Sequence, residues 1–248
     1  MSVADPDPGA HPDAQPWPRR PRRLATAVVA ELVDRIVGGR IAEGAALPPE
    51  PSLCEKYGVS RTVVREAVKS LEGMNLVSVQ QGQGTRVRPF AEWHLLDPVV
   101  LAATVRHDAE SSILDDLVDV RRALEAQLAA QAATRATAED LRVIEAAMAR
   151  LEAEVEDPAR YLRADIEFHD AVMAASGNRL GRATVRALTA EAFRSLRYVG
   201  DPTPQDGRIS NQAHRAVLEH LLAREGEAAG MAMNQHILGA WHRRRPRF

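Results

Sequence analysis

The chain lacks the features that mark disulfide-rich miniproteins and membrane proteins. Its 248 residues include one cysteine, Cys54, which cannot form an internal disulfide. Aromatic residues make up 4% of the sequence, so aliphatic side chains and alanine must fill most of the core. No apolar run approaches the roughly 20 residues that a membrane-spanning helix needs, and the N-terminus lacks the pattern of a secretory signal. We therefore expect a cytoplasmic protein of one or two domains with no membrane partner.

The charges are unevenly distributed along the chain. Between Arg19 and Arg88 there are 12 Lys and Arg residues against 7 Asp and Glu, whereas the rest of the chain has 20 against 27. A basic first part on an acidic body favours contact between that first part and a polyanion. Because a basic segment can equally be a solvated surface, the charge alone does not decide the function.

The first 110 residues divide into a tail, a compact domain and a linker. Residues 1–23 are rich in Pro, Asp and Arg without an apolar period, which predicts a disordered tail that either contacts DNA phosphates or only aids solubility. Residues 24–89 have the pattern of three short helices and two strands around the glycine-rich turn Gln81-Gly82-Gln83-Gly84. This order predicts a winged helix-turn-helix domain, and residues 90–110 are expected to form a linker.

Residues 111–248 have helical periodicity throughout, with no strand pattern and no internal repeat. Turn signals rich in Gly, Pro and Asp divide this region into segments of helical length. The predicted fold is therefore mostly α, with a winged helix-turn-helix followed by an all-α domain. Helices are expected near 111–134, 138–155, 159–175, 179–198, 208–223 and 226–243.

The helix expected after residue 60 carries a basic face. Arg61, Arg65 and Lys69 lie four residues apart and so share one side of a helix. Basic and polar residues near the N-terminus of a short helix fit the major groove, where Arg pairs with guanine. An ordinary amphipathic helix with a solvated basic side has the same pattern, so the spacing leaves both interpretations open.

Three segments of residues 24–89 form a recognisable pattern: Leu47-Pro48-Pro49-Glu50, then Gly58-Val59-Ser60-Arg61-Thr62-Val63-Val64-Arg65-Glu66-Ala67, then Gln81-Gly82-Gln83-Gly84-Thr85-Arg86-Val87. With these segments, the sequence of residues 24–89 resembles the GntR family of bacterial transcription regulators. The resemblance implies that Arg61, Thr62 and Arg65 contact operator DNA. It places Ser60 and Val63 at neighbouring positions and Gly82 against the minor groove.

Two positions depart from the family pattern. Pro49 stands where most members have Ser, and Pro51 stands where members often carry a basic residue that contacts DNA. Proline is well tolerated in the first turn of a helix, so the fold does not suffer. One expected DNA contact is missing, however, and the operator sequence of relatives does not carry over to this chain.

Polar residues interrupt the apolar stripes of three predicted helices in the second domain. Asp165 and His169 lie on one stripe, His214 on the next and His236 on the last. Burying a carboxylate without a partner is costly, which favours a common partner for the group. Three His and one Asp suit a divalent metal such as Zn, Ni, Mn or Fe. Each histidine alone is more often a satisfied core residue, so the spacing leaves metal binding open.

Residues 111–243 are similar to the FCD ligand-binding domain of FadR-type members of the GntR family. This resemblance implies an antiparallel bundle of six or seven helices in which the same Asp and three His hold the metal. It also implies that an organic acid binds the metal and pairs with Arg121. Arg121 lies on the flank of the stripe Leu117, Val120 and Leu124, so it is expected to face the cavity rim. An exposed Arg121 paired with Glu125 is the alternative.

Together these features predict a metabolite-responsive transcription regulator, most simply a repressor, and not an enzyme. It would bind palindromic double-stranded operator DNA as a homodimer, because two recognition helices about one turn apart require a two-fold site. The segment Trp93-His94-Leu95-Leu96-Asp97-Pro98 is similar to linkers of members that control hexonate catabolism and favours a sugar acid as effector. Lactate, other hydroxy acids and dicarboxylates stay open, as does the direction of the response.

Two other functions are compatible with the same residues. A regulator that binds DNA constitutively would hold a purely structural metal and would not respond to any acid. A metallohydrolase would need a general base beside the metal. Only Glu167 lies near the expected ligands in sequence, and it points off their stripe.

Overall fold

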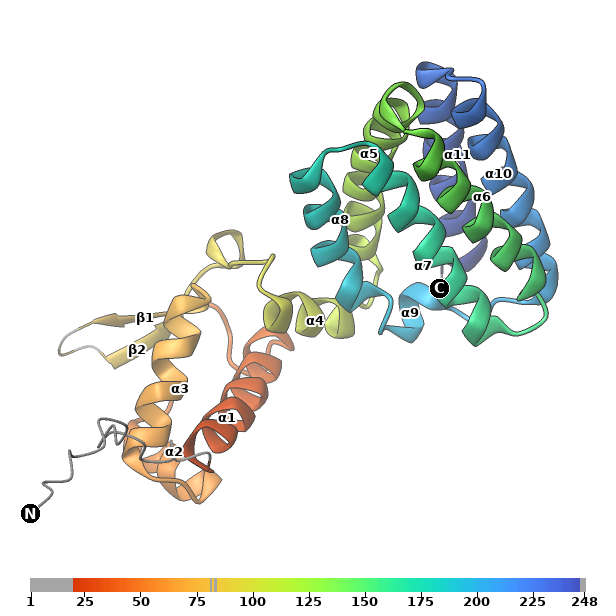
Figure 1. Cartoon of the computed structure of the whole chain (residues 1–248). Helices are drawn as coiled ribbons and strands as arrows, with labels where there is room; N and C mark the ends of the chain where they lie inside the picture. The colour runs from red at the N-terminus through yellow and green to blue at the C-terminus, as the bar shows by residue number, and fades with distance from the viewer. Residues whose placement is uncertain (1–19, 81, 83, 246–248) are drawn as a thin grey trace, which may run out of the picture. The chain divides into compact units, whose positions relative to one another are not determined.

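The computed structural model describes residues 20–80, 82 and 84–245, which form two compact units (Figure 1). The first unit ends at Trp93 and the second begins at His94. Residues 1–19 of the predicted tail, and Gln81 and Gln83 of the predicted hairpin turn, lie outside the described residues. Within the part of the chain that is described, no helix combines the length and apolar character needed to cross a membrane.

The first unit has the element order of a winged helix-turn-helix, as predicted. Its helices are α1 (Arg20–Val37), α2 (Glu50–Tyr57) and α3 (Arg61–Gly73). Strands β1 (Val77–Gln80) and β2 (Gly84–Val87) pair antiparallel with Val77 opposite Val87. An aliphatic core joins these elements: Val28, Leu32, Val33, Ile36, Leu53, Val64, Ala67, Leu71, Leu76 and Val77.

Local chemistry fixes the turn between α2 and α3. Gly58 ends α2 in the left-handed conformation with φ of 62°, which glycine adopts without a Cβ clash. Ser60 then caps α3, because its hydroxyl accepts a hydrogen bond from the backbone N–H of Val63 at 3.4 Å. The turn sets the direction of α3 and therefore the face that this helix presents to solvent.

The second unit is a helical bundle, again as predicted. Its helices are α4 (Pro98–His107), α5 (Ser112–Arg135), α6 (Ala138–Ala153), α7 (Pro158–Ala175), α8 (Arg179–Ala192), α9 (Leu196–Val199), α10 (Pro204–Leu222) and α11 (Gly226–Arg244). Thr137 and Thr203 each form a capping box with the Asp three residues later, which starts α6 and α10. The four residues predicted to bind metal lie on α7, α10 and α11.

Three predicted boundaries are corrected by the structure. Helix α1 begins at Arg20, inside the predicted tail. The predicted linker contains a 3-10 turn over Phe90–Glu92 and the whole of α4. Helix α4 forms because Asp97 caps its first two N–H groups and Val100 and Leu101 are buried. The predicted helix over 179–198 is two helices, α8 and α9, and the break between them precedes the fully buried Tyr198.

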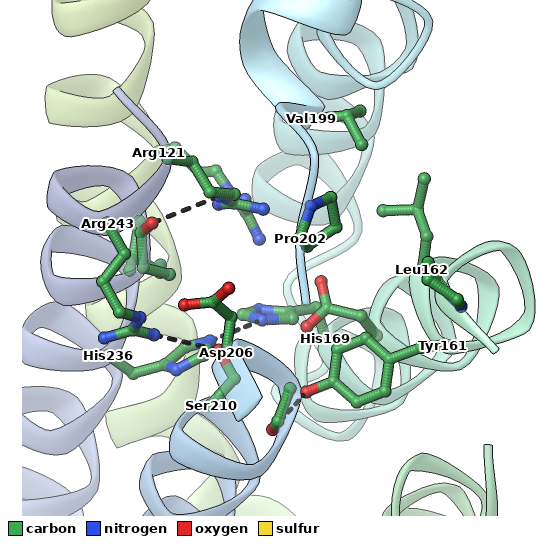
Figure 2. A pocket seen from close by; sticks show the side chains of 16 residues that line it. Arg121, Tyr161, Leu162, His169, Val199, Pro202, Asp206, Ser210, His236 and Arg243 are labelled. Atoms are coloured by element: carbon green, nitrogen blue, oxygen red, sulfur yellow. Dashed lines mark hydrogen bonds between the residues drawn. The ribbon is translucent and has the colours of Figure 1, made fainter. Parts of the chain in front are cut away.

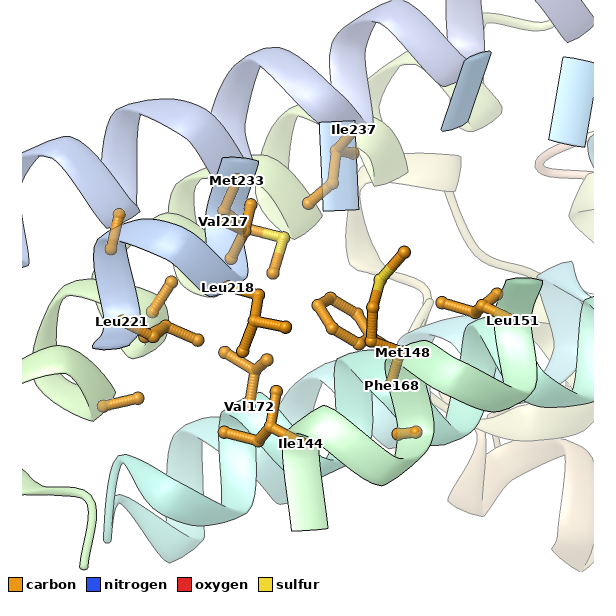
Figure 3. Close-up of a cluster of buried hydrophobic side chains, with 14 of the residues drawn as sticks. Ile144, Met148, Leu151, Phe168, Val172, Val217, Leu218, Leu221, Met233 and Ile237 are labelled. Atoms are coloured by element: carbon orange, nitrogen blue, oxygen red, sulfur yellow. The ribbon is translucent and has the colours of Figure 1, made fainter. Parts of the chain in front are cut away.

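Apolar side chains from α6, α7, α10 and α11 meet in one core (Figure 3). Helices α7 and α10 of this core also supply polar neighbours, because His169 follows Phe168 on α7 and His214 precedes Val217 on α10. The apolar packing therefore holds the backbone positions from which the histidines project. The labelled core residues are Ile144, Met148, Leu151, Phe168, Val172, Val217, Leu218, Leu221, Met233 and Ile237.

Helices α5 and α11 approach closely because α11 carries glycine at the contact. A Cβ atom on Gly230 would lie 3.0 Å from the carbonyl oxygen of Ala126, which is backbone and cannot swing aside. We expect Gly230→Ala to lower the free energy of unfolding by about 1–3 kcal/mol in urea titrations, despite the better helix propensity of alanine.

Gly239 provides a matched control on the same helix. The nearest atom to its added Cβ is the end of the flexible Arg243 side chain, at 3.5 Å. We expect Gly239→Ala to be neutral or stabilising. If both variants were equally stable, the close approach of the two helices at Gly230 would not be a constraint.

Candidate metal centre and DNA-facing helix

Helix α3 presents most of the predicted DNA-facing side chains to solvent. Arg61, Thr62, Arg65 and Lys69 are exposed, as is Gly82 at the wing tip. Val63 is only 6% exposed, and its contact with DNA stays a prediction. It lies four and eight residues before the buried Ala67 and Leu71 and so belongs to the apolar stripe of α3. Ser60, although exposed, uses its hydroxyl to cap the helix.

Arg65 is held in place by Glu50 of α2. Its Nε lies 3.1 Å and 3.0 Å from the two carboxylate oxygens. Because both groups are exposed, the pair contributes little stability. It does orient the guanidinium, and both hydrogen bonds use Nε, whereas pairing with guanine can use the terminal nitrogens. The sequence showed Glu50 only as part of the family motif, without a role.

The four residues predicted to bind metal lie together inside the second unit. Asp165 and His169 come from α7, His214 from α10 and His236 from α11. One potential ligand atom of each lies within 4.8 Å of the other three. The histidines are buried and Asp165 is partly buried. Helix packing thus brings together residues that the sequence only placed on separate stripes.

The spacing of the ligand atoms fits a single divalent ion. The Nε2 of His169 lies 3.1 Å from Nε2 of His236 and 3.3 Å from Nε2 of His214. The Nε2 of His214 lies 3.3 Å from a carboxylate oxygen of Asp165. Neighbouring ligands around an ion with metal–ligand distances of about 2.1 Å are separated by about 3.0–3.4 Å. The four residues therefore match a metal ion in both donor type and spacing.

A buried carboxylate supports one of these histidines from behind. Glu125 of α5 is 1% exposed and lies against Nδ1 of His169. If His169 is neutral and donates its Nδ1 proton to this carboxylate, its Nε2 presents a lone pair to the centre. Glu125 also pairs with Nε of Arg121, so one side chain contacts both the metal centre and the predicted acid-binding residue.

The predicted position of Arg121 requires a correction. It is 3% exposed and lies within the buried stripe of α5 instead of at a rim. The pairing with Glu125 that the alternative interpretation expected is present, but it is buried instead of exposed. The Nη1 of Arg121 also donates a hydrogen bond to the hydroxyl of Tyr198 at 2.8 Å. Arg121 nevertheless lines the same pocket as Asp165, His169 and His236.

Burial and neighbouring charges shift the pKa values of three side chains in this centre. Burial lowers the pKa of His214 to about 3, and repulsion from His169 and Arg121 acts in the same direction. Burial likewise holds the pKa of His236 well below its usual range. For Asp165, burial favours the neutral form, but attraction by His169 and His214 outweighs it and lowers the pKa. Neutral imidazoles and an ionised carboxylate are the forms that bind metals.

A small pocket opens beside the cluster (Figure 2). Its volume is about 50 Å³, which holds a few water molecules. Tyr161 and Leu162 line one side, and Val199 and Pro202 line another. The Nη2 of Arg243 donates a hydrogen bond to the Ser210 hydroxyl at 3.1 Å within the lining. The pocket therefore combines candidate metal ligands with cationic and hydroxyl groups.

Several of these residues escaped the sequence interpretation. Ser210 and Arg243 look ordinary on polar helix faces, and Tyr198 lies where a longer helix was expected. In the sequence, only the turn signal Gly200-Asp201-Pro202 marked the connection that carries Tyr198. Glu167, the candidate base of the hydrolase interpretation, is exposed and pairs with Arg150 at 3.3 Å.

A winged helix-turn-helix joined to an all-α domain is an architecture of bacterial transcription regulators. Comparison with known domains agrees: residues 24–87 match the bacterial regulatory proteins, gntR family, and residues 116–239 match the FCD domain. The chain therefore belongs to the GntR family and carries an FCD domain. Its relatives are transcription regulators that bind operator DNA, so this protein is a DNA-binding regulator and not an enzyme.

Individual relatives match most of the chain. The galactonate operon transcriptional repressor of Escherichia coli is 30% identical over 207 residues, which cover 83% of this chain and 90% of that protein. The Glc operon transcriptional activator of Escherichia coli is 30% identical over 225 residues, or 87% of each chain. The structure of Lar, which controls expression of the Listeria monocytogenes agr system, has a TM-score of 0.53 at 16% identity, covering 91% of this chain and 96% of that chain. At that identity it shows a shared fold only.

Proposed function

We propose that this regulator senses a small organic acid through a divalent metal held by Asp165, His169, His214 and His236. The observation that carries the proposal is the convergence of four potential ligand atoms within 4.8 Å, beside a pocket that Arg121 lines together with three of the four residues. The donor set suits Zn, Ni, Mn or Fe. When bound, the ion would supply a Lewis-acidic position for a carboxylate oxygen.

The charges around the pocket give a physical reason for linking metal and acid. Three positive side chains line the pocket, and two negative side chains line it. Glu125, which pairs with Arg121, makes the charges balance, and His214 and His236 are neutral. A divalent ion would therefore leave the site with excess positive charge, which attracts an anion. The side chains counted are Arg121, Arg243 and Arg244 against Asp165, Asp206 and Glu125.

The remaining lining favours an acid that also carries hydroxyl groups. Ser210 and Arg243 supply a hydroxyl and a guanidinium, and Tyr161 lies nearby with its hydroxyl 2.8 Å from Oδ1 of Asn211. Such groups suit the hydroxyls of a sugar acid. The name of the galactonate operon repressor supports the same class. We therefore propose a sugar acid such as a hexonate as the effector.

We further propose that the regulator acts as a repressor, as a homodimer, in the cytoplasm. Repression follows the galactonate operon relative, whereas the Glc operon relative is an activator. A dimer follows from the helix-turn-helix, because paired recognition helices read a palindromic operator. Arg61, Thr62, Arg65 and Lys69 of α3 would contact the DNA, with Gly82 at the wing tip.

Metal removal tests the effector site directly. Thermal melting of the full chain would be followed with galactonate, lactate, glycolate and dicarboxylates, before and after EDTA treatment. A ligand at 100 times its Kd adds about 2.7 kcal/mol, which raises the Tm of a chain of this size by roughly 5–10 °C. We expect one acid to produce this shift, EDTA to abolish it and added metal to restore it.

The same experiment separates the alternative function. If EDTA lowers the Tm but no acid shifts it, the metal is structural and the regulator is constitutive. If EDTA changes neither the Tm nor the metal content of the protein, the four residues do not bind metal. An acid shift that survives complete metal removal would contradict the charge argument above.

A further inference from the structure

Arg121 is already engaged by two partners within the protein. Its Nε contacts Glu125, and its Nη1 donates a hydrogen bond of 2.8 Å to the Tyr198 hydroxyl. The contact with Glu125 uses the inner edge of the guanidinium. The Tyr198 hydroxyl takes one of the two N–H groups of Nη1. An acid that uses this N–H to bind Arg121 bidentately must replace the Tyr198 hydroxyl, whereas Glu125 can stay in place.

The ring of Tyr198 is buried and packs against three side chains. It is fully buried, stacked on Trp241 with ring centroids 5.6 Å apart, and edge-on to Phe193 at 5.4 Å. The guanidinium of Arg244 lies 5.4 Å from its ring centroid. These contacts hold the Tyr198 hydroxyl oxygen at a terminal nitrogen of Arg121, where a carboxylate oxygen of the acid would bind.

The segment that carries Tyr198 also closes the pocket. Helix α9 has only four residues, Leu196–Val199, and lies in the connection between α8 and α10. Val199 and Pro202 of this connection line the pocket (Figure 2). With a volume of about 50 Å³, the pocket holds a few water molecules. We expect a six-carbon acid to displace part of this lining when it binds.

We infer that Tyr198 is an internal competitor of the effector, and that it sets effector affinity by holding residues 196–203 closed over Arg121. The inference rests on the proposed effector site. An arriving carboxylate replaces the phenolic oxygen on the terminal nitrogens of Arg121, and the loss of that hydrogen bond releases the connection. Effector affinity is then reduced by the fraction of molecules in which Tyr198 occupies the guanidinium.

The competitor also has a route towards the DNA-binding unit. Helix α8, which immediately precedes the Tyr198 connection, packs against α4. Helix α4 is the first helix after the chain leaves the first unit at Trp93. Displacement of Tyr198 would therefore act on the end of α8. Helix α8 contacts α4, which directly follows the boundary between the two units. Release of α9 would thus couple pocket occupancy to α4.

Tyr198→Phe tests the competition while keeping the aromatic packing. Calorimetric titration of galactonate into the zinc-loaded full chain should give about tenfold tighter binding for the variant, because a hydrogen bond to a charged group no longer opposes the acid. Tyr57→Phe is the matched control, since Tyr57 lies in the first unit and its hydroxyl makes no hydrogen bond within the described residues. Its galactonate affinity should match that of the parent chain. Unchanged or weaker binding by Tyr198→Phe would overturn the inference.

Hydrogen exchange gives a second readout that needs neither metal nor acid. In the metal-free protein, backbone amides of residues 196–203 should exchange several-fold faster in Tyr198→Phe than in the parent chain, while Tyr57→Phe leaves them unchanged. Equal exchange in parent and Tyr198→Phe would overturn the closing role of the hydroxyl. If no protein form binds any acid but exchange still accelerates, the proposed effector function fails while the closing role stands.

Discussion

Replacing His214 with alanine is expected to remove the bound metal and, with it, the response to acid. His214 is fully buried, and its Nε2 lies 3.3 Å from both Nε2 of His169 and an oxygen of Asp165. Among the described residues the cluster has four potential ligands, so the variant keeps three of them. Loss of supporting residues outside the ligand set already costs 10–100-fold in metal affinity, and loss of a ligand should cost more.

The measurement is metal content after dialysis against a fixed concentration of free metal, followed by the acid-induced Tm shift. His220→Ala is the matched control, because His220 also belongs to α10 but is only partly buried and pairs with Glu225 at 2.7 Å. The control should keep both metal and acid response. Full metal content in folded His214→Ala protein would exclude His214 as a ligand.

Operator binding should separate the metal centre from the DNA-facing helix. His214 lies in the second unit, whereas α3 belongs to the first. We therefore expect His214→Ala to bind operator DNA with the affinity of the acid-free parent chain and to keep that affinity when acid is added. The loss would concern the response alone.

The metal cluster was predictable because it violates a simple pattern. A carboxylate and three imidazoles on apolar stripes must find a partner, and their positions along the chain already identified Asp165, His169, His214 and His236. Their distances were not predictable, because these depend on how three helices rotate and pack. The turn signals located most helix ends, because turns and helix caps depend on residues that are close together in the sequence.

Helix α5 shows where the pattern failed. The sequence favoured an inward stripe through Val120, since it is apolar, but Val120 is 45% exposed while Arg121 and Glu125 are buried. One residue of error rotates a helix by about 100°. The buried stripe of α5 contains the ion pair between Arg121 and Glu125. A search for apolar periodicity misses this stripe, because it assigns charged residues to the exposed face. Tyr198 was hidden similarly, because only tertiary packing brings α9 to Arg121.

Replacing Arg65 with alanine is expected to weaken specific operator binding strongly without unfolding the protein. Arg65 is exposed on α3, and its exposed ion pair with Glu50 contributes little stability. A bidentate contact with guanine is worth about 1–3 kcal/mol, and a dimer loses it twice. The expected loss is therefore about 30-fold to 10⁴-fold in affinity, measured on an operator selected from random DNA with the parent chain.

Two further variants distinguish base recognition from charge. Arg40→Ala removes the same charge from the same unit, but Arg40 follows α1 and pairs with Asp34. It should lower affinity only slightly and equally for operator and unrelated DNA. Glu50→Gln has two opposing effects: it loosens the orientation of Arg65, and it removes a negative charge that repels any DNA. We expect the first to dominate, so that the affinity for operator falls several-fold relative to the affinity for unrelated DNA. If Arg65→Ala weakened operator and unrelated DNA equally, Arg65 would contact phosphate instead of a base; if neither changed, α3 would not read the operator through this residue.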